Sequence, residues 1–447
     1  MRTCRPAPAV VFVAIALLAA CTSSPAASAP PRTATGPAPA ASAPPLAADT
    51  PIPVVSGPGD AWLVVGRSGE DALRVMLASS GEEDYELPIG IPNETWGRLV
   101  TVTPGRPNSL VEDLTIQPGF GGPLRTIDGA WRLPTVGLDP IPVGLSADGS
   151  TIVLVEDRAD GAAAPVVSRF AVLDRGLRSE PRIVELKGDF DFDTVSPDGS
   201  ILYVAEHVPG PLAGRYQVRA VDTATGVMRD AIIVDKRNID EEMAGWPVDQ
   251  ELRSDGTVLT LYRGVEHPFI HALHTIDSWA VCIDLPATGI DDPQAASDWG
   301  VITLADGRSS LAINATLGII VDVDADLTVR RTVDFEPSAQ NPITLAKFGH
   351  IEPGAVGRRL VAAPDGSAVF AAGARGIVRI ETADLTVSGR WLEGRAVDAI
   401  AVLPDGSAVY ALVRDGGRIA RLDPKTGEVL GWAAGEGYDR LVGIVPW

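Results

Sequence analysis

The sequence has little cysteine and a deficit of positive charge. It contains 3 cysteines in 447 residues, which is too few for a fold held together by disulfides. Its 58 acidic side chains outnumber the 37 Lys and Arg side chains, so the formal net charge is -21. Such a surface repels polyanions, which argues against nucleic acid or an anionic membrane surface as the partner.

Long apolar runs are also scarce, and the single clear one is short. It extends from Pro8 to Ala20, follows Arg2 and Arg5, and ends in Leu18-Ala19-Ala20-Cys21. About 13 residues span about 20 Å as a helix, well short of the ~30 Å hydrocarbon core of a bilayer. That length is typical of a cleaved export signal.

The Leu-Ala-Ala-Cys ending resembles the lipobox of bacterial lipoprotein precursors. The resemblance implies a signal peptide over residues 1–20, with a lipid attached to the thiol of Cys21. It also implies a location on the extracytoplasmic side of the cell membrane. An ordinary secretory signal with an incidental cysteine is the alternative.

Residues 21–50 lack aromatic side chains and consist almost wholly of Ala, Pro, Ser and Thr. Such a segment buries too little apolar surface to offset its ordering entropy, so we expect it to be disordered. At about 3.1 Å per residue in polyproline II it reaches at most about 90 Å. We interpret it as a stalk that holds a folded domain, residues 51–447, away from the membrane.

The rest of the chain repeats a phrase built on Asp-Gly, as in Ser196-Pro-Asp-Gly-Ser200. Apolar, β-branched runs flank most copies, and Asp-Gly suits a tight turn, so each copy predicts a β-hairpin. A spacing of about 40 to 60 residues is close to that of a four-stranded propeller blade. The glycines of these turns, including one degenerate copy at the start, are Gly105, Gly149, Gly199, Gly256, Gly307, Gly366 and Gly406.

A second hairpin phrase follows several of these turns, so each period contains four strands. The copies lie at Arg219–Val227, Val321–Val329, Gly376–Val387 and Arg421–Val429. Seven turns predict an all-β propeller of seven four-stranded blades, with six or eight as alternatives.

The ring is expected to close by pairing early strands with late ones, because closure removes exposed sheet edges. The candidates are Ala61–Gly66 or Ala72–Leu77 with Arg440–Pro446.

Together, Ser-Pro-Asp-Gly-x-x-x-Tyr-Val at 196–204 and Leu-Asp-x-x-Thr-Gly-x-Val at 422–429 resemble the YVTN-type, lactonase-like and WD40-like β-propellers of bacterial envelopes. The resemblance covers residues from about 95 to 447. It implies the propeller fold and, for lactonase-like members, a metal ion in the channel that activates water or polarises a lactone carbonyl. The ligands of that metal cannot be matched residue by residue in this sequence.

Three histidines lie close together in the sequence, at His267, His271 and His274. On a strand the first two face one side and His274 faces the other, so a metal site made from all three needs a bend between them. A packed loop with polar histidines is the alternative. Cys282 lies in the apolar run 279–285, which predicts a buried, inert thiol.

Alternating acids occur at Asp189–Asp193 and Asp322–Asp326. Neither has the sixth-position Gly or twelfth-position Glu of a calcium loop, so both are interpreted as half-exposed strands. No resident cofactor is predicted, and calcium held in the channel is the alternative.

The sequence therefore favours a non-enzymatic module that binds a protein, peptide or glycan of the cell envelope. A metal-dependent lactonase-like hydrolase is the alternative, and a quinoprotein-type dehydrogenase subunit is a more distant one. The chain shows no nucleophile elbow, Walker loop or Rossmann fingerprint.

Overall fold

The computed structural model describes residues 61–445, apart from 68–69, 71, 94–95, 117–120, 137–140, 159–165, 210–213, 238–242, 290–294, 296–297 and 337–356. The predicted signal peptide, Cys21 and the stalk lie outside the described residues. Everything described belongs to one compact unit, Ala43–Trp447. Within the described ranges, no helix has the length and apolarity to cross a membrane.

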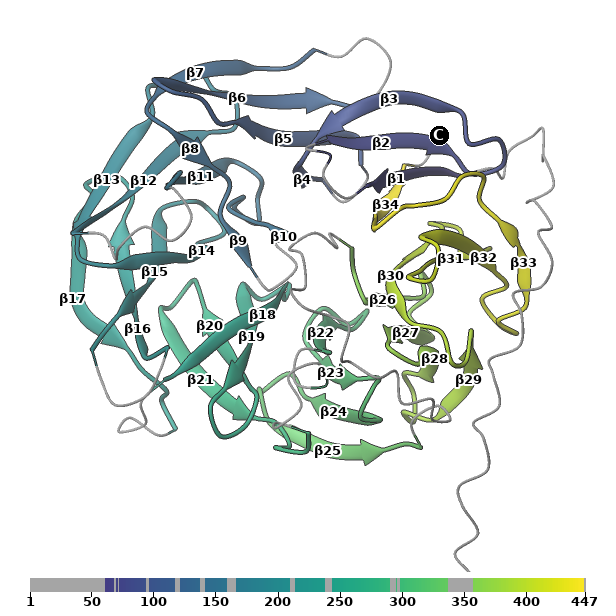
Figure 1. Ribbon diagram of the computed structural model, residues 1–447. Coiled ribbons are helices and arrows are strands. Elements are labelled where there is room, and N and C mark those ends of the chain that lie inside the picture. Colours follow the sequence, from purple (N-terminus) through teal and green to yellow (C-terminus); the bar gives the residue numbers. More distant parts are fainter. Residues whose placement is uncertain are drawn as a thin grey trace, which may run out of the picture. The chain divides into compact units, whose positions relative to one another are not determined.

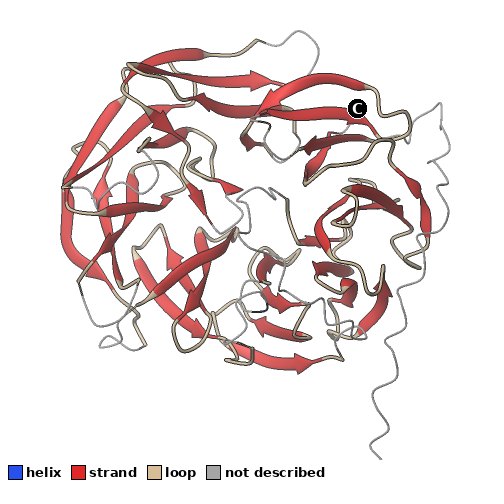
Figure 2. Ribbon diagram, viewed as in Figure 1, coloured by secondary structure: helices blue, strands red, loops and turns tan. Residues whose placement is uncertain are grey.

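The elements of this unit are strands, joined by turns and loops (Figure 2). They form eight four-stranded sheets and one short two-stranded hairpin. Each four-stranded sheet is one blade, with its first strand nearest the central axis (Figure 1). The chain is therefore an all-β propeller, as predicted, but the predicted count of seven blades is wrong.

Within each blade the four strands follow one another from the axis outward. Blade 1 contains β4 (Gly90–Pro92), β5 (Arg98–Thr103), β6 (Asn108–Thr115) and β7 (Leu124–Asp128), and blade 2 contains β8 (Trp131–Arg132), β11 (Thr151–Glu156), β12 (Val167–Asp174) and β13 (Arg182–Lys187). The hairpin β9 (Thr135–Val136) and β10 (Ile141–Pro142) is inserted after β8. Blade 3 contains β14 (Phe190–Val195), β15 (Ile201–His207), β16 (Tyr216–Asp222) and β17 (Met228–Ile233), and blade 4 contains β18 (Gly245–Leu252), β19 (Thr257–Gly264), β20 (Phe269–His274) and β21 (Trp279–Asp284).

The second half of the ring repeats this order. Blade 5 contains β22 (Trp299–Thr303), β23 (Ser310–Asn314), β24 (Ile319–Val323) and β25 (Val329–Asp334), and blade 6 contains β26 (Leu360–Ala362), β27 (Ala368–Gly373), β28 (Gly376–Glu381) and β29 (Val387–Trp391). Blade 7 contains β30 (Val397–Val402), β31 (Val409–Val413), β32 (Arg418–Leu422) and β33 (Val429–Trp432), and blade 8 contains β34 (Arg440–Val445), β1 (Trp62–Gly66), β2 (Ala72–Leu77) and β3 (Glu83–Pro88).

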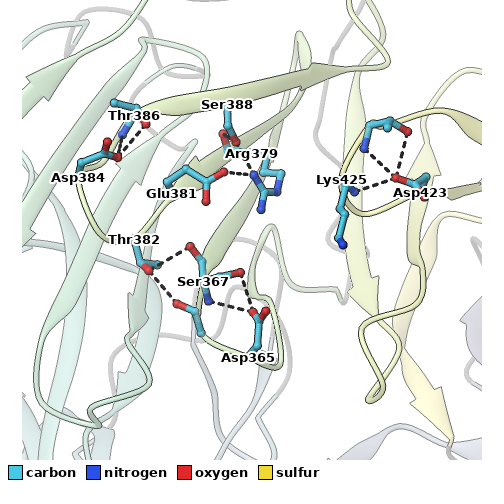
Figure 3. A network of polar contacts seen from close by, with 12 residues as sticks. Asp365, Ser367, Arg379, Glu381, Thr382, Asp384, Thr386, Ser388, Asp423 and Lys425 are labelled. Atoms are coloured by element: carbon cyan, nitrogen blue, oxygen red, sulfur yellow. Dashed lines mark hydrogen bonds and ion pairs between the residues drawn. The ribbon is translucent and has the colours of Figure 1, made fainter.

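Six Asp-Gly turns lie immediately before the second strand of blades 2 to 7, which confirms the repeat. Their glycines take φ between 69° and 81°, the left-handed region that glycine enters without strain. In each turn the Asp carboxylate accepts a hydrogen bond, 2.8 to 3.0 Å long, from the backbone N–H two residues later. Figure 3 shows this for Asp365 and Ser367, with the outer-hairpin turns at Asp384 and Asp423 nearby.

Blades 1 and 8 have no such turn, and the blade count was wrong because only blade 1 has a degenerate copy in its place. Gly105 lies between β5 and β6, the second and third strands of blade 1, so that degenerate copy still marked a blade. Blade 8 takes its first strand from the end of the chain and its second from the beginning, so no turn joins them.

This closing pair confirms one of the two predicted candidates. Trp62 of β1 pairs with Val445 of β34, and Gly66 pairs with Arg440, with a bulge between Val64 and Val65. The other candidate, 72–77, lies one strand farther out as β2.

Apolar side chains fill the spaces between neighbouring blades. Phe370 and Trp391 of blade 6, for example, pack in one buried cluster with Val397 and Trp432 of blade 7. Burying each such side chain stabilises the fold by about 1.5 to 3 kcal/mol. The buried framework holds the first strands of the blades, where the polar groups lie.

Candidate functional site

Two hollows lie where the first strands of blades 1 to 4 approach one another. The larger, of about 230 Å³, is lined by side chains from blades 2, 3 and 4, and we call it the blade 2–4 pocket. The second, of about 190 Å³, also takes in Ile91 of blade 1 and Arg358, which precedes β26; we call it the axial pocket. Phe192 and Gln250 line both pockets.

Strand β14 brings carboxyl groups to the blade 2–4 pocket through Asp191 and Asp193. Strict alternation would give these two side chains the same exposure. The register with β15 instead shifts between Phe192 and Thr194, so Asp193 is the extra residue of a β-bulge. Bulges re-aim side chains. Asp193 is only 5% exposed, whereas the side chain of Asp191 is 72% exposed.

The side chain of Asp193 forms few interactions that would offset the cost of burying it. Its Oδ2 atom is buried without a hydrogen-bond partner among the described residues. Its backbone oxygen accepts a hydrogen bond from Gln250 Nε2 at 3.1 Å, and the same amide donates to Thr260 Oγ1 at 3.0 Å. Burial raises the pKa of Asp193 to about 7, because desolvation disfavours the carboxylate.

Asp191 is more exposed and is paired with His207. Its Oδ2 atom lies 2.7 Å from His207 Nε2. Burial alone would raise the pKa of Asp191, but the hydrogen bond and the charges of His207, Arg132 and Arg158 lower it below its usual value. The same hydrogen bond raises the pKa of His207.

Three arginines contribute positive charge to the lining. Glu156 lies 3.5 Å from Arg158 Nε and 3.4 Å from Arg169 Nη1. Arg132 is held more loosely, with its Nε atom 3.8 Å from Asp157 and a hydrogen bond from Nη1 to the Leu133 carbonyl at 3.3 Å.

An aromatic stack forms the wall beside β19. Tyr262 lines the pocket and stacks on Tyr216 at a ring-centroid distance of 4.9 Å and on Phe269 at 5.2 Å. His271 meets both tyrosine rings edge-on and is fully buried. Burial lowers the pKa of His271 to about 4, so its imidazole is neutral at physiological pH.

The structure does not bring the three sequence-predicted histidines together. His274 faces the opposite side of β20 from His271 and stacks on Trp279 at 4.9 Å. His267 precedes β20, and its Nδ1 atom lies 3.8 Å from Asp284. Among the residues that the structure describes, no group of three or more His, Cys, Asp or Glu side chains is placed to hold a metal ion.

The other sequence candidates have structural roles in blades 4 and 5. Cys282 is half-buried on β21, with its Sγ atom 3.9 Å from His271 Nδ1. Asp322 of β24 is buried and lies 3.4 Å from Arg331, while Asp324 caps the following turn through two backbone N–H groups.

Sequence reasoning missed the polar residues of β18. Asp249 Oδ2 accepts a hydrogen bond from Val301 N at 2.9 Å, and Glu251 lies 3.1 Å from Arg358 Nη1. Burial is the main cause that raises the pKa of both carboxyl groups. The available signal was a run of three polar residues, 249–251, just before a Ser-Asp-Gly turn. Perturbed carboxyl groups gathered near one place mark a candidate site.

Comparison with known proteins gives the fold alone. No protein-family model matches the chain, and no curated protein matches it. Among solved structures, the chain is similar to the dihydro-heme d1 dehydrogenase NirN, with 13% identity, a TM-score of 0.51, and coverage of 89% of this chain and 77% of NirN. It is similar to apo AztD from Citrobacter koseri, with 13% identity, a TM-score of 0.51, and coverage of 86% and 97%.

A further similar structure is the periplasmic gluconolactonase PpgL of Pseudomonas aeruginosa, with 18% identity and a TM-score of 0.42 over 76% of this chain and 95% of that one.

Proposed function

We propose that this chain is an extracytoplasmic lipoprotein whose β-propeller binds a ligand of the cell envelope in the blade 2–4 pocket. The observation that carries the proposal is the buried carboxyl group of Asp193, which lines a pocket and has an oxygen without a partner among the described residues. Buried polar atoms are nearly always hydrogen-bonded, so an exception in a pocket calls for an explanation. A ligand that donates a hydrogen bond to Asp193 provides such an explanation.

The lining of the pocket has the composition of a ligand site. Polar side chains make up most of the lining, and they converge on the same space as apolar side chains such as Val155, Phe192 and Pro247. Pockets of this kind fix a ligand's orientation through the polar groups and gain affinity from the apolar ones.

The anchor and the location rest on the sequence. Leu18–Cys21 supplies the expected lipidation motif, and residues 21–50 supply the predicted stalk. A precursor with Cys21→Ala is expected to lose its lipid and leave the membrane fraction after cell fractionation. Unchanged retention in that fraction contradicts the anchor.

A lactone hydrolase is the second candidate function, on one observation. A carboxyl group with a pKa of about 7 suits general-base catalysis near neutral pH, and Asp193 is such a group. The described residues do not present a donor set for a metal ion, so they give no basis for a metal-assisted step.

Binding is tested with the full chain and a variant that fills the pocket. Thr135 is exposed and lines the pocket, so Thr135→Trp blocks the space without disturbing the core. Thr126 is exposed on the outer strand β7, so Thr126→Trp is the matched control. A ligand at a hundredfold excess over its Kd stabilises the native state by about 2.7 kcal/mol.

The screen uses thermal unfolding with small molecules, peptides and glycan fragments prepared from cell envelopes. The proposal expects a shift in Tm that Thr135→Trp removes and Thr126→Trp retains. A shift that survives in both variants, or no shift with any fraction, contradicts it. Turnover of a lactone panel that depends on Asp193 favours the hydrolase instead.

A further inference from the structure

We infer that the blade 2–4 pocket takes a small amino acid, with its ammonium group at the buried Asp193 carboxylate and its own carboxylate at Arg132. This inference rests on the proposed function of the pocket as a ligand site and names the ligand class. Three observations support it: the buried Asp193 oxygen without a partner among the described residues, the weak contacts of the Arg132 guanidinium, and the small volume of the pocket.

The buried carboxyl group of Asp193 is best paired with a cationic hydrogen-bond donor. An ionised carboxylate accepts hydrogen bonds only, and leaving it buried without a counter-charge is costly. A neutral hydroxyl supplies one hydrogen bond and no charge, whereas an ammonium supplies three donors and the opposite charge. Charge-assisted hydrogen bonds of this kind are roughly twice as strong as neutral ones. No described Lys or Arg side chain forms an ion pair with Asp193, so a counter-charge for its ionised form comes from the ligand.

A second charged group in the lining calls for an anion. Arg158 and Arg169 are both held by Glu156, and Arg169 also lies 3.0 Å from Glu185. Among the described residues, Arg132 makes a 3.8 Å approach to Asp157 and one backbone hydrogen bond, its charge also acts on Asp191, and its side chain is 46% exposed. A planar guanidinium with free donors is suited to bidentate binding of a carboxylate.

The volume limits the ligand to a small molecule. The volume of the pocket is about 230 Å³. That is below the range of about 300 to 1,000 Å³ for pockets that take drug-sized ligands. A small molecule such as an amino acid is suited to a space of this size.

Binding of an ammonium must compete with protonation of Asp193. Since its pKa is about 7 in the free protein, an ammonium ligand loses affinity as pH falls. The apparent Kd rises about 90-fold from pH 8 to pH 5 when only the ionised acid binds. The charged and titratable groups around the pocket and behind its aromatic wall are Arg132, Glu156, Arg158, Arg169, Asp191, Tyr203, His207, Tyr216, Tyr262 and His271.

One of those groups needs its own control. His207 is also titratable, and its hydrogen bond to Asp191 raises its pKa. Its protonation as pH falls also adds positive charge near the pocket. A His207→Gln variant removes that titration, and the pH dependence from Asp193 is expected to persist in it.

The experiment measures binding to the full chain by isothermal titration calorimetry. The probes are glycine, β-alanine, γ-aminobutyrate, δ-aminovalerate and ε-aminohexanoate, whose charges are separated by increasing lengths, with butylamine and butyrate as single-charge controls. At pH 8 one chain length is expected to bind best, and removing either charge is expected to weaken binding at least about tenfold. Asp193→Asn is expected to lose about 30-fold in affinity, and most of the pH dependence with it.

Asp193→Asn changes a buried residue, so a second variant keeps the test independent of its folding. Arg132→Gln is suitable because Arg132 is half-exposed. It is expected to weaken the amino acids about tenfold and to leave butylamine unchanged. Arg178→Gln, an exposed arginine outside the pocket lining, is the matched control and is expected to change nothing.

The outcomes separate this inference from the proposed function. Failure of every amino acid to bind at pH 8 overturns the inference, as does equal binding of butyrate or of a neutral sugar. If an envelope compound of another class still binds in a way that Thr135→Trp blocks, the ligand class is wrong and the proposed function stands. If no compound of any class binds in the pocket, both are overturned.

Discussion

Replacing Asp193 with Asn is expected to change how the stability of the propeller depends on pH. Asp193 is 5% exposed, and burial raises its pKa from 3.8 to about 7. One pKa unit corresponds to 1.36 kcal/mol, so a shift of about three units is worth about 4 kcal/mol. The side chain is buried, so solvent does not screen this effect.

The direction follows from proton binding. Between the unfolded pKa near 4 and the folded pKa near 7, the native state holds a proton at Asp193 that the unfolded chain has released. The free energy of unfolding therefore falls as pH rises through this window, by about 4 kcal/mol for this group. Asn has nearly the same shape and never ionises, so the variant lacks this loss.

The measurement compares urea unfolding of the wild type and of Asp193→Asn at several pH values from 4 to 8. Other titrating groups contribute equally to both proteins, so the difference between them isolates Asp193. An amide in this position costs about 1 to 3 kcal/mol where its own hydrogen bonds are unmade, but that cost does not vary with pH. The variant is expected to gain about 4 kcal/mol relative to the wild type between pH 4 and pH 8. A difference that stays constant across this range refutes the reasoning, because Asp193 would then be ionised or solvated in the native state.

Three further substitutions test the framework by urea unfolding. Asp113 is fully buried and forms ion pairs with Arg98 and Arg175. Asp113→Ala is therefore expected to lower the free energy of unfolding by about 3 kcal/mol. A loss below about 1 kcal/mol contradicts a buried ion pair between blades. Leu441 is fully buried on the closing strand, so Leu441→Ala is expected to cost about 2 to 5 kcal/mol, and no loss contradicts closure through β34. Asp405→Ala removes the acceptor of one Asp-Gly turn and is expected to cost about 1 kcal/mol, whereas an unchanged stability contradicts its role.

The repeat predicted most of the fold because it encodes backbone geometry directly. An Asp that accepts a backbone hydrogen bond, followed by a Gly at positive φ, has few conformations other than a tight turn. That is why all six Asp-Gly turns lie where they were expected. Blade 8 was not counted because no turn connects its first two strands, β34 and β1, which only pair with each other. It therefore has no Asp-Gly turn phrase in the sequence.

The site was less predictable because it depends on one bulge that leaves no trace in the sequence. The acidic run 189–193 was correctly interpreted as part of a strand, yet alternation alone gives no reason for Asp193 to be buried while Asp191 is exposed. The extra residue in β14 makes that difference, because a bulge re-aims the side chains of its strand.

Blade 7 provides an internal comparison for the significance of Asp193. Asp398 is also the extra residue of a bulge between the first two strands of its blade, although it lies farther from its Asp-Gly turn than Asp193 does. There the carboxylate accepts hydrogen bonds from Arg414 Nε at 2.9 and 3.1 Å, so the protein itself supplies the cation. In blade 3 the bulge residue Asp193 lines a pocket, and its Oδ2 atom has no partner among the described residues. Blades 3 and 7 thus both place an acidic residue at a bulge, but of these two residues only Asp193 has a buried oxygen without a partner among the described residues. An unpartnered carboxyl group in a closed core would destabilise the protein without benefit. Because Asp193 lies in a pocket, a bound ligand can supply the missing partner.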